Sequence, residues 1–103
     1  MDKVIFRKFK DGQIIALFPE IFDSYKYNHG VLCSSYMHVG QHSGADYDTV
    51  CSNTKLAKPE EYADLKRELE SLGYSLEVVS TNSIGSQKIL MQQYYDYMKE
   101  LGN

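Results

Sequence analysis

The chain has 103 residues, a length that allows one domain, and a domain of this size buries only about two-thirds of its unfolded surface. Apolar residues make up 43% and charged residues 24% of the sequence, which is typical of a folded globular protein and not of a disordered chain. The formal charge of −3 argues against binding of long nucleic acids, and no apolar run approaches the roughly 20 residues of a membrane-spanning helix.

Residues 3–18 predict a β-hairpin, because Asp11-Gly12 is a preferred pair for a two-residue type I′ turn. Such a turn pairs Lys10 with Gln13 and fixes the register of the strands. The expected cross-strand pairs are Phe9 with Ile14, Arg7 with Ala16, Ile5 with Phe18, Phe6 with Leu17 and Lys8 with Ile15. Both faces are then largely apolar, so we expect both to be covered, by two helices or by one helix and a second subunit.

The next stretch combines turns with a third strand. Pro19-Glu20 is expected to end the second strand, and residues 23–30 to form an exposed, turn-rich excursion. Val31 to Val39 predicts the third strand, in which alternation places Tyr36 and His38 on the same face. A glycine-containing loop at 40–46 follows, and the pattern at 47–53 fits either a short strand or irregular chain.

A first helix is predicted to begin at Pro59, which suits the first helical position, and to end before Gly73. Its expected sheet-facing stripe is Tyr62, Leu65, Leu69 and Leu72. A fourth strand is predicted from Tyr74 to Ser80.

A second helix is predicted over about residues 86–101. It carries two apolar rows, one of Leu90, Tyr94, Tyr97 and Leu101 and one of Met91, Tyr95 and Met98. Either both rows face the core, or one packs on a second copy to make a homodimer. Together the elements predict an α+β fold with a mainly antiparallel sheet of about four strands, in the order β-β-β-α-β-α, and two helices. One domain is expected over 1–103, with its core in 3–80.

The cysteines and the basic residues indicate the compartment and one possible anion site. Cys33 and Cys51 lack CxxC spacing and no targeting segment is recognised, so reduced thiols in a cytoplasm are expected. A local basic cluster would serve either a small anion or a solvated strand edge, and it consists of Lys3, Arg7, Lys8 and Lys10.

The segment from residue 36 to residue 48 concentrates histidines, aspartates, tyrosines and two glycines. Gly40 and Gly44 would let the backbone approach a phosphate, while an exposed phenol would stack on a base and a carboxylate would accept from a ribose hydroxyl. No catalytic residue, metal or cofactor is predicted. The expected ligand-binding residues are Arg7, Tyr36, His38, Gly40, Gln41, His42, Ser43, Gly44, Asp46 and Tyr47.

Other interpretations of this segment stay open. His38 and His42 with a carboxylate such as Asp46 would suit zinc, iron or manganese, although His-x3-His spacing is a strong signal only on a helix. Ser43 or Cys33 beside a histidine base would make a hydrolase, but no GxSxG, HExxH or Walker motif accompanies them. Alternatively, the glycines form an ordinary turn whose polar side chains cap the local backbone.

Three blocks of the chain together resemble a known group of sequences. They are residues 4–20, the segment Tyr36-Met37-His38-Val39-Gly40-Gln41-His42-Ser43, and residues 61–79. They resemble a family of short, uncharacterised proteins encoded by phages, prophages, plasmids and conjugative elements of Firmicutes and Bacteroidetes. The Tyr-x-His-x-Gly-Gln-His core is the most specific part, and the tail from Thr81 departs from the pattern. The family brings no activity with it; the resemblance implies an accessory role that blunts host defences.

We therefore expect a non-catalytic accessory protein that acts in the cytoplasm of a bacterial host. It would bind a phosphorylated, nucleotide-like small molecule and thereby sequester a host immune signal. A second possibility is a protein-interaction module that inhibits a host defence protein through exposed tyrosines. A third is a small metal-dependent or nucleophilic hydrolase.

Overall fold

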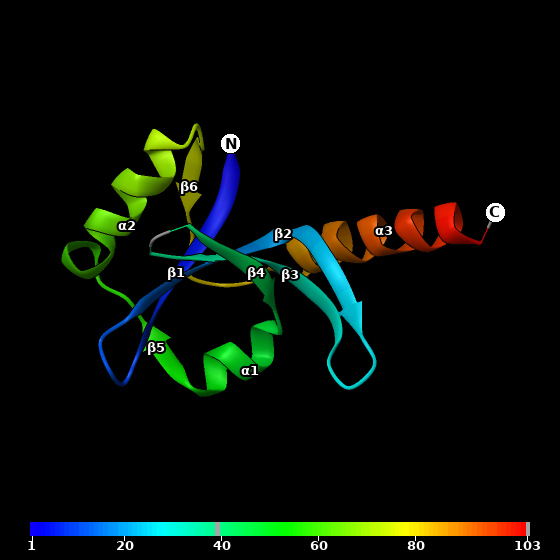
Figure 1. The fold of residues 1–103 in the computed structure, drawn as a ribbon, viewed down its shortest axis with the longest axis horizontal. Helices are drawn as coiled ribbons and strands as arrows, with labels where there is room; N and C mark the ends of the chain where they lie inside the picture. Colours follow the sequence, from blue (N-terminus) through cyan, green and yellow to red (C-terminus); the bar gives the residue numbers. More distant parts are fainter. Residues whose placement is uncertain (39, 103) are drawn as a thin grey trace.

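The structure is a computed structural model that describes residues 1–38 and 40–102. Within these ranges the chain forms one α+β unit of six strands and three helices (Figure 1). The strands are β1 (Asp2–Phe9), β2 (Ile14–Lys26), β3 (Gly30–Met37), β4 (Gln41–Ala45), β5 (Thr54–Leu56) and β6 (Leu76–Val78). The helices are α1 (Tyr47–Ser52), α2 (Pro59–Ser71) and α3 (Ile84–Leu101). The predicted α+β class is confirmed.

Five strands follow one another in the order β4-β3-β2-β1-β5, each antiparallel to its neighbour, and β6 runs parallel to the first half of β1. The mainly antiparallel sheet is thus confirmed, but the expected number of about four strands and the order β-β-β-α-β-α are wrong. One additional strand, β4, occupies the expected loop at 40–46, and the other is β5. The ambiguous segment 47–53 contains α1, and the predicted strand 74–80 is reduced to β6.

The turn of the first hairpin is one residue longer than the sequence predicts. The Phe9 N–H donates to the Gln13 carbonyl at 2.9 Å, and Gly12, with φ of 94°, donates to the Phe9 carbonyl at 2.9 Å. A three-residue loop with glycine in the left-handed region is another common hairpin connection. It shifts each expected pair by one residue, so Ile5 lies opposite Leu17, and the predicted register is wrong.

β2 does not end at Pro19, as predicted, but continues to Lys26. Proline has no N–H to donate, so it is tolerated where a ladder is irregular. The pairing of β2 with β3 shifts between Phe18 and Phe22, and again before Ser24. The irregularity therefore falls around the proline and lets the strand pass through it.

The excursion expected at 23–30 is reduced to a turn at residues 27–29. β3 begins at Gly30 and ends at Met37, close to the predicted third strand. The expected last residue of that strand, Val39, lies outside the described residues. Tyr36 is buried and His38 is exposed.

α2 confirms the predicted first helix in its position and in most of its stripe. Leu65 and Leu69 are buried against the sheet, and Tyr62 stacks on Phe6 with ring centroids 4.3 Å apart. Leu72, the expected fourth member of the stripe, is 56% exposed because it follows the last turn of the helix.

Helices cover both faces of the sheet, as the apolar hairpin predicted. We call the side that carries α2 the closed face; its buried residues are Val4, Phe6, Ala16, Phe18, Tyr36, Ala57, Leu65, Leu69 and Leu76. We call the other side, where α1 and α3 lie, the open face; its buried residues are Ile5, Ile15, Leu17, Cys33 and Ala45. Val50 of α1 and Leu90 of α3 are only partly buried against this second cluster.

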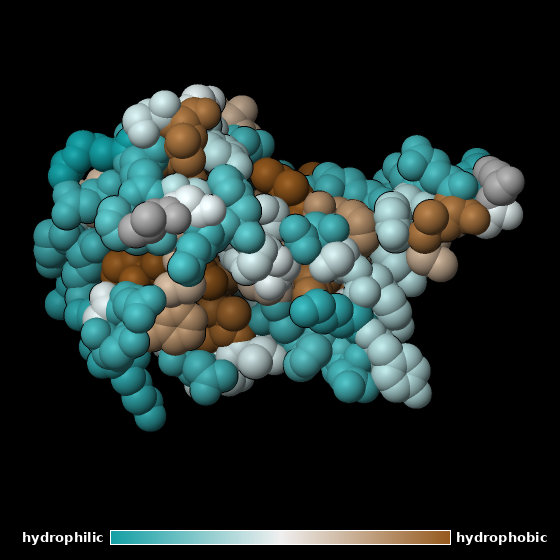
Figure 2. Space-filling model, in the orientation of Figure 1, coloured by the Kyte–Doolittle hydropathy of each residue, from teal (hydrophilic) through white to brown (hydrophobic). Residues whose placement is uncertain are grey.

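α3 packs on β2 as far as Tyr97, whose ring lies 5.2 Å from that of Phe22, and its C-terminal end extends away from the body (Figure 1). The Gln93 side chain accepts from the Phe22 N–H at 2.8 Å and donates to the Glu20 carbonyl at 2.7 Å. Figure 2 shows apolar side chains at the far end of the helix, where Leu101 is 62% exposed. The homodimer therefore stays a prediction. Within 1–38 and 40–102, no helix combines the length and apolar character needed to cross a membrane.

Candidate functional site

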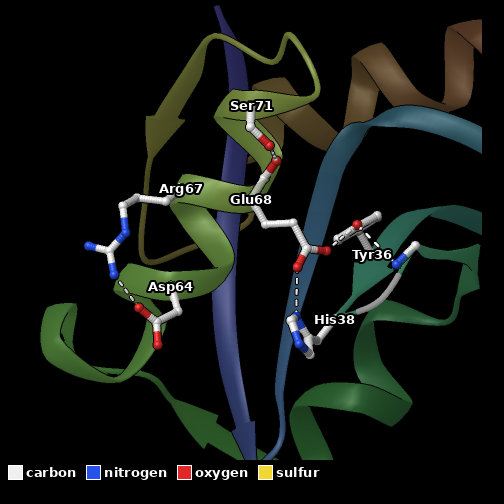
Figure 3. A network of polar contacts seen from close by, with 7 residues as sticks. Tyr36, His38, Asp64, Arg67, Glu68 and Ser71 are labelled. Atoms are coloured by element: carbon white, nitrogen blue, oxygen red, sulfur yellow. Dashed lines mark hydrogen bonds and ion pairs between the residues drawn. The ribbon is translucent and has the colours of Figure 1, made fainter.

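Tyr36 lies at the centre of a hydrogen-bond network that joins the β3–β4 turn to α2 (Figure 3). Its buried hydroxyl donates to one carboxylate oxygen of Glu68 and accepts from the Gly40 N–H at 3.1 Å. The other Glu68 oxygen lies 2.6 Å from His38 Nδ1. The hydrogen bond to Glu68 and the burial of the phenol raise the pKa of Tyr36, so its hydroxyl stays protonated.

His42 contacts the rings of Tyr36 and Tyr74. Its Nε2 lies 3.1 Å from the Tyr74 hydroxyl, and its ring meets Tyr36 edge-on with centroids 4.6 Å apart. Tyr74 in turn stacks on Phe18 with centroids 5.1 Å apart. Both predicted histidines therefore contact the body of the protein, although 77% of the His38 side chain remains exposed.

The contacts around these histidines give little support to the hydrolase and metal alternatives. Burial raises the pKa of the Cys33 thiol to about 12, so this thiol stays protonated and unreactive near neutral pH. The Ser43 hydroxyl lies 3.3 Å from the Ser35 hydroxyl, and the Ser35 hydroxyl donates to the Ser43 carbonyl at 2.9 Å. Within residues 1–38 and 40–102, no group of three or more His, Cys, Asp and Glu is arranged to hold a metal ion.

The two glycines of the expected phosphate loop have structural roles. Gly40, with φ of 75°, adopts a conformation that favours glycine, and its N–H already donates to Tyr36. Gly44 lies inside β4 opposite Ser34, where a Cβ atom would approach Asp23 Oδ2 to 2.5 Å. Because the Gly40 N–H is in use, it is not open to an external anion.

The structure separates the predicted binding residues into three places. The first is the β3–β4 hairpin, which holds Tyr36, His38, Gly40, Gln41, His42, Ser43 and Gly44. Asp46 and Tyr47 lie at the start of α1, in a cleft that also borders α3. Arg7 lies on β1 and contacts the opposite end of α1.

Arg7 holds the corner between α1 and β5. Its Nε donates to the Thr54 hydroxyl at 3.0 Å, and a terminal nitrogen donates to the carbonyls of Thr54 and Cys51 at 2.9 and 3.2 Å. The carbonyls at the end of a helix lack intrahelical partners, so the guanidinium satisfies groups that the backbone leaves unpaired. Arg7 therefore positions the chain from Cys51 to Thr54.

This corner forms one wall of a depression of about 410 Å³ that we call the lysine cleft. The cleft is lined by Lys8, Phe9, Lys10, Ser52, Asn53, Thr54 and Lys55. Lys8 forms an ion pair with Glu61, and the hydrogen bond from Lys8 holds the pKa of that carboxyl below its ordinary value. Lys10 and Lys55 form no ion pair within the described part of the chain.

The sequence pointed to Lys8 and Lys10 as part of a basic cluster but missed the rest of this cleft. Lys55 reaches it only because β5 pairs with β1, where Lys55 lies opposite Lys8. The short strand β5 was not predicted, and no local motif marks Lys55. The available signal was the basic cluster itself, which is unexpected in a chain with a net charge of −3.

The Tyr36 network and the lysine cleft differ in what they offer to a ligand. The network uses its amide and phenol groups internally, whereas the cleft presents two ammonium groups without a carboxylate partner among the described residues. The lysine cleft is therefore the candidate site for an anionic ligand. Comparison of the chain with protein-family models, curated proteins and solved structures gave no match, so its functional assignment depends on the chemistry of these residues.

Proposed function

We propose that this protein is a non-catalytic binding protein that captures a phosphorylated, nucleotide-like small molecule in the lysine cleft. The observation that supports this most directly is the concentration of lysines at one place in an acidic chain. Lys8 and Lys55 lie directly opposite each other, and like charges at such a position destabilise a sheet. Glu61 neutralises only one of them, so an anion in the cleft would relieve the remaining repulsion.

The other polar groups of the cleft are already used by α1, which leaves the ammonium groups as its main donors. The Ser52 hydroxyl donates to the Asp48 carbonyl and the Asn53 side chain to the Thr49 carbonyl, both at 2.8 Å. A phosphate would therefore bind between Lys10 and Lys55. Phe9 is half-buried and supplies the aromatic surface of the lining, on which a base would stack.

The biological role follows from the resemblance to short proteins of phages and other mobile elements. A small binding protein of this kind would sequester a nucleotide signal of the host defence without turning it over. The cytoplasm of a bacterial host is the compartment in which it would meet that signal.

Calorimetric titration tests this proposal directly. The purified protein is titrated with cyclic dinucleotides, cyclic oligonucleotides, ADP-ribose derivatives and inorganic phosphate. The double variant Lys10→Gln/Lys55→Gln should lose about tenfold or more in affinity, because a hydrogen bond to a charged group contributes roughly 1.5–3 kcal/mol. Lys88→Gln on α3, which removes the same charge far from the cleft lining, should bind as the wild type does.

Two results would contradict the proposal. One is the absence of binding to every compound in this panel and to extracts of defence-activated cells. The other is an equal loss of affinity in Lys88→Gln, because this would show that only the total charge of the protein matters.

A second candidate function is inhibition of a host defence protein by direct binding. The specific observation in its favour is the exposure of tyrosines, with Tyr27 in the β2–β3 turn 92% exposed and Tyr95 on α3 58% exposed. Tyrosine is enriched among the residues that dominate binding energy at protein interfaces. Stoichiometric retention of one host protein by the wild type, lost in Tyr95→Ala/Tyr97→Ala and kept in Lys10→Gln/Lys55→Gln, would favour this function over the first.

A further inference from the structure

A second cleft lies at the other end of α1, where this helix and the segment after β6 approach α3. Its volume is about 580 Å³, within the range of small-molecule sites. We call it the α3 cleft. The lining residues on which its chemistry depends are Asp46, Tyr47, Asp48, Asn82, Leu90 and Met91.

The charge of the α3 cleft is opposite to that of the lysine cleft. Asp46 and Asp48 line it together with His29, whose Nδ1 lies 3.4 Å from Asp46 Oδ2, and no lysine or arginine does. Partial burial raises the pKa of Asp46, but hydrogen bonds from Thr49 and His29 outweigh this effect, so its pKa lies below the ordinary value and it stays ionised. The Asp48 carboxylate has no hydrogen bond or ion pair within residues 1–38 and 40–102, so it is available to a ligand.

Asn82 adds an acceptor that the fold leaves unsatisfied. Its side-chain oxygen is buried and accepts no hydrogen bond from the described residues. The residue is nevertheless held in place, because the Gln87 side chain donates to the Asn82 backbone carbonyl at 3.0 Å. A buried carbonyl oxygen without a donor is unfavourable, so a ligand that displaces the atoms covering it and supplies an N–H group would be stabilising.

The rest of the lining suits an apolar or cationic body. Leu90 and Met91 contribute aliphatic and thioether surface from α3. Burial and a hydrogen bond to Cys51 raise the pKa of Tyr47 to about 12, so its ring carries a neutral phenol. A neutral aromatic ring attracts a cation to its face.

We propose that the α3 cleft binds a small organic amine, with its ammonium group at Asp46 and Asp48 and its carbon skeleton on Tyr47, Leu90 and Met91. An N–H group of the ligand donates to Asn82 Oδ1. Carboxylates together with an unsatisfied carbonyl accept hydrogen bonds and donate none, which selects a ligand rich in donors. An anion would be repelled by the same carboxylates. This site is independent of the lysine cleft and of the function proposed for it.

Titration of the full chain with tyramine, agmatine and spermidine tests the inference, with hexanoate as an anionic control. At least one amine should bind saturably at one site, and hexanoate should not. Asp48→Asn should weaken amine binding about tenfold, as expected for loss of one charge-assisted contact. Asp96→Asn removes the same charge from the outer half of α3 and should leave the affinity unchanged.

Two further variants separate this site from a merely structural one. Asn82→Leu removes the unsatisfied acceptor at similar volume, so amine affinity should fall while the unfolding midpoint in urea does not. Lys10→Gln/Lys55→Gln should bind the amine as the wild type does, whatever its effect on nucleotides. The inference is overturned if no amine binds saturably, if Asp96→Asn weakens binding as much as Asp48→Asn, or if neither Asp48→Asn nor Asn82→Leu changes the affinity.

Discussion

The two faces of the sheet are built differently. On the closed face, Leu65 and Leu69 of α2 pack in a cluster with buried aromatic rings. The Tyr36 hydroxyl joins the β3–β4 hairpin to the same helix by its hydrogen bond to Glu68. On the open face, α1 buries none of its residues and α3 fully buries only Ser86 among the described residues. The α3 cleft lies at one end of α1 on the open face, and the lysine cleft lies at the other end of α1, at the edge of the sheet, where Lys8 also reaches Glu61 of α2.

This difference suggests a division of roles. The helices α1 and α3 bury fewer of their own residues than α2 does, so this layer leaves gaps at both ends of α1. The gaps at the two ends of α1 carry opposite charges, because Lys10 and Lys55 line one and Asp46 and Asp48 the other. We infer that the closed face maintains the fold and that the two ends of α1 are the regions that meet ligands.

The largest expected effect comes from truncating the same residue type on each face. Leu69→Ala on the closed face should lower the free energy of unfolding by about 2–5 kcal/mol, because it leaves a cavity in a fully buried site. Leu90→Ala on the open face should cost only about 1 kcal/mol, because Leu90 is partly exposed and borders a cleft. Urea denaturation followed by circular dichroism measures both.

Equal losses in these two variants would break the comparison, since they would show that the faces contribute alike. A larger loss in Leu90→Ala would reverse it. An unchanged denaturant slope is required in both variants, so that the difference reports stability and not a change in the unfolded state.

The next effect concerns the hydroxyl that joins the β3–β4 turn to α2. Tyr36→Phe keeps the ring but removes the donor to Glu68 and the acceptor of the Gly40 N–H, so it should cost about 1–3 kcal/mol. Tyr74→Phe is the matched control. Its hydroxyl contacts the exposed ring of His42, so the loss should be smaller when measured by the same denaturation. A larger loss in Tyr74→Phe would mean that the Tyr36 network does not anchor the turn.

The sequence allowed prediction of the elements that depend on local signals. Pro59 and Gly73 bracket α2, and the apolar spacing within it identified Leu65 and Leu69. The doubly apolar hairpin correctly implied that both faces are covered. The register failed because Asp11-Gly12 fits both a two-residue and a three-residue loop, and only the packing of the strands decides between them.

The candidate sites were harder to predict because they are built from pairings that no local pattern encodes. β5 has only three residues, so Lys55 could not be placed beside Lys8 from the sequence. The histidines of the 36–48 segment were recognised as a polar group, but their partners, Glu68 of α2 for His38 and Tyr74 for His42, were not. Gly40 and Gly44 were interpreted as part of an anion-binding loop. Glycine is equally suited to a turn, as at Gly40, and to close packing, as at Gly44, and the sequence does not distinguish these roles from a loop that binds an anion.

The smallest expected effect is the response to acid and salt of one carboxyl near each face. Lys8 lowers the pKa of Glu61 below its ordinary value near 4.5, while Thr49 and His29 outweigh burial and lower the pKa of Asp46 below 3.8. A carboxyl whose pKa is lower in the folded state contributes stability above its unfolded pKa and loses it as pH falls through the folded value. Glu61→Gln and Asp46→Asn should therefore be less stable than the wild type at neutral pH and approach it as the pH falls below the ordinary carboxyl pKa values, as urea denaturation at several pH values would show. The deficit of Glu61→Gln should shrink on added salt because its ion pair with Lys8 is partly exposed, whereas that of Asp46→Asn should shrink less, since Asp46 accepts a hydrogen bond from the uncharged Thr49 hydroxyl besides its contact with His29. An equal salt sensitivity of the two deficits would show that the start of α1 is held by charge alone, and the α3 cleft would then lack a fixed wall.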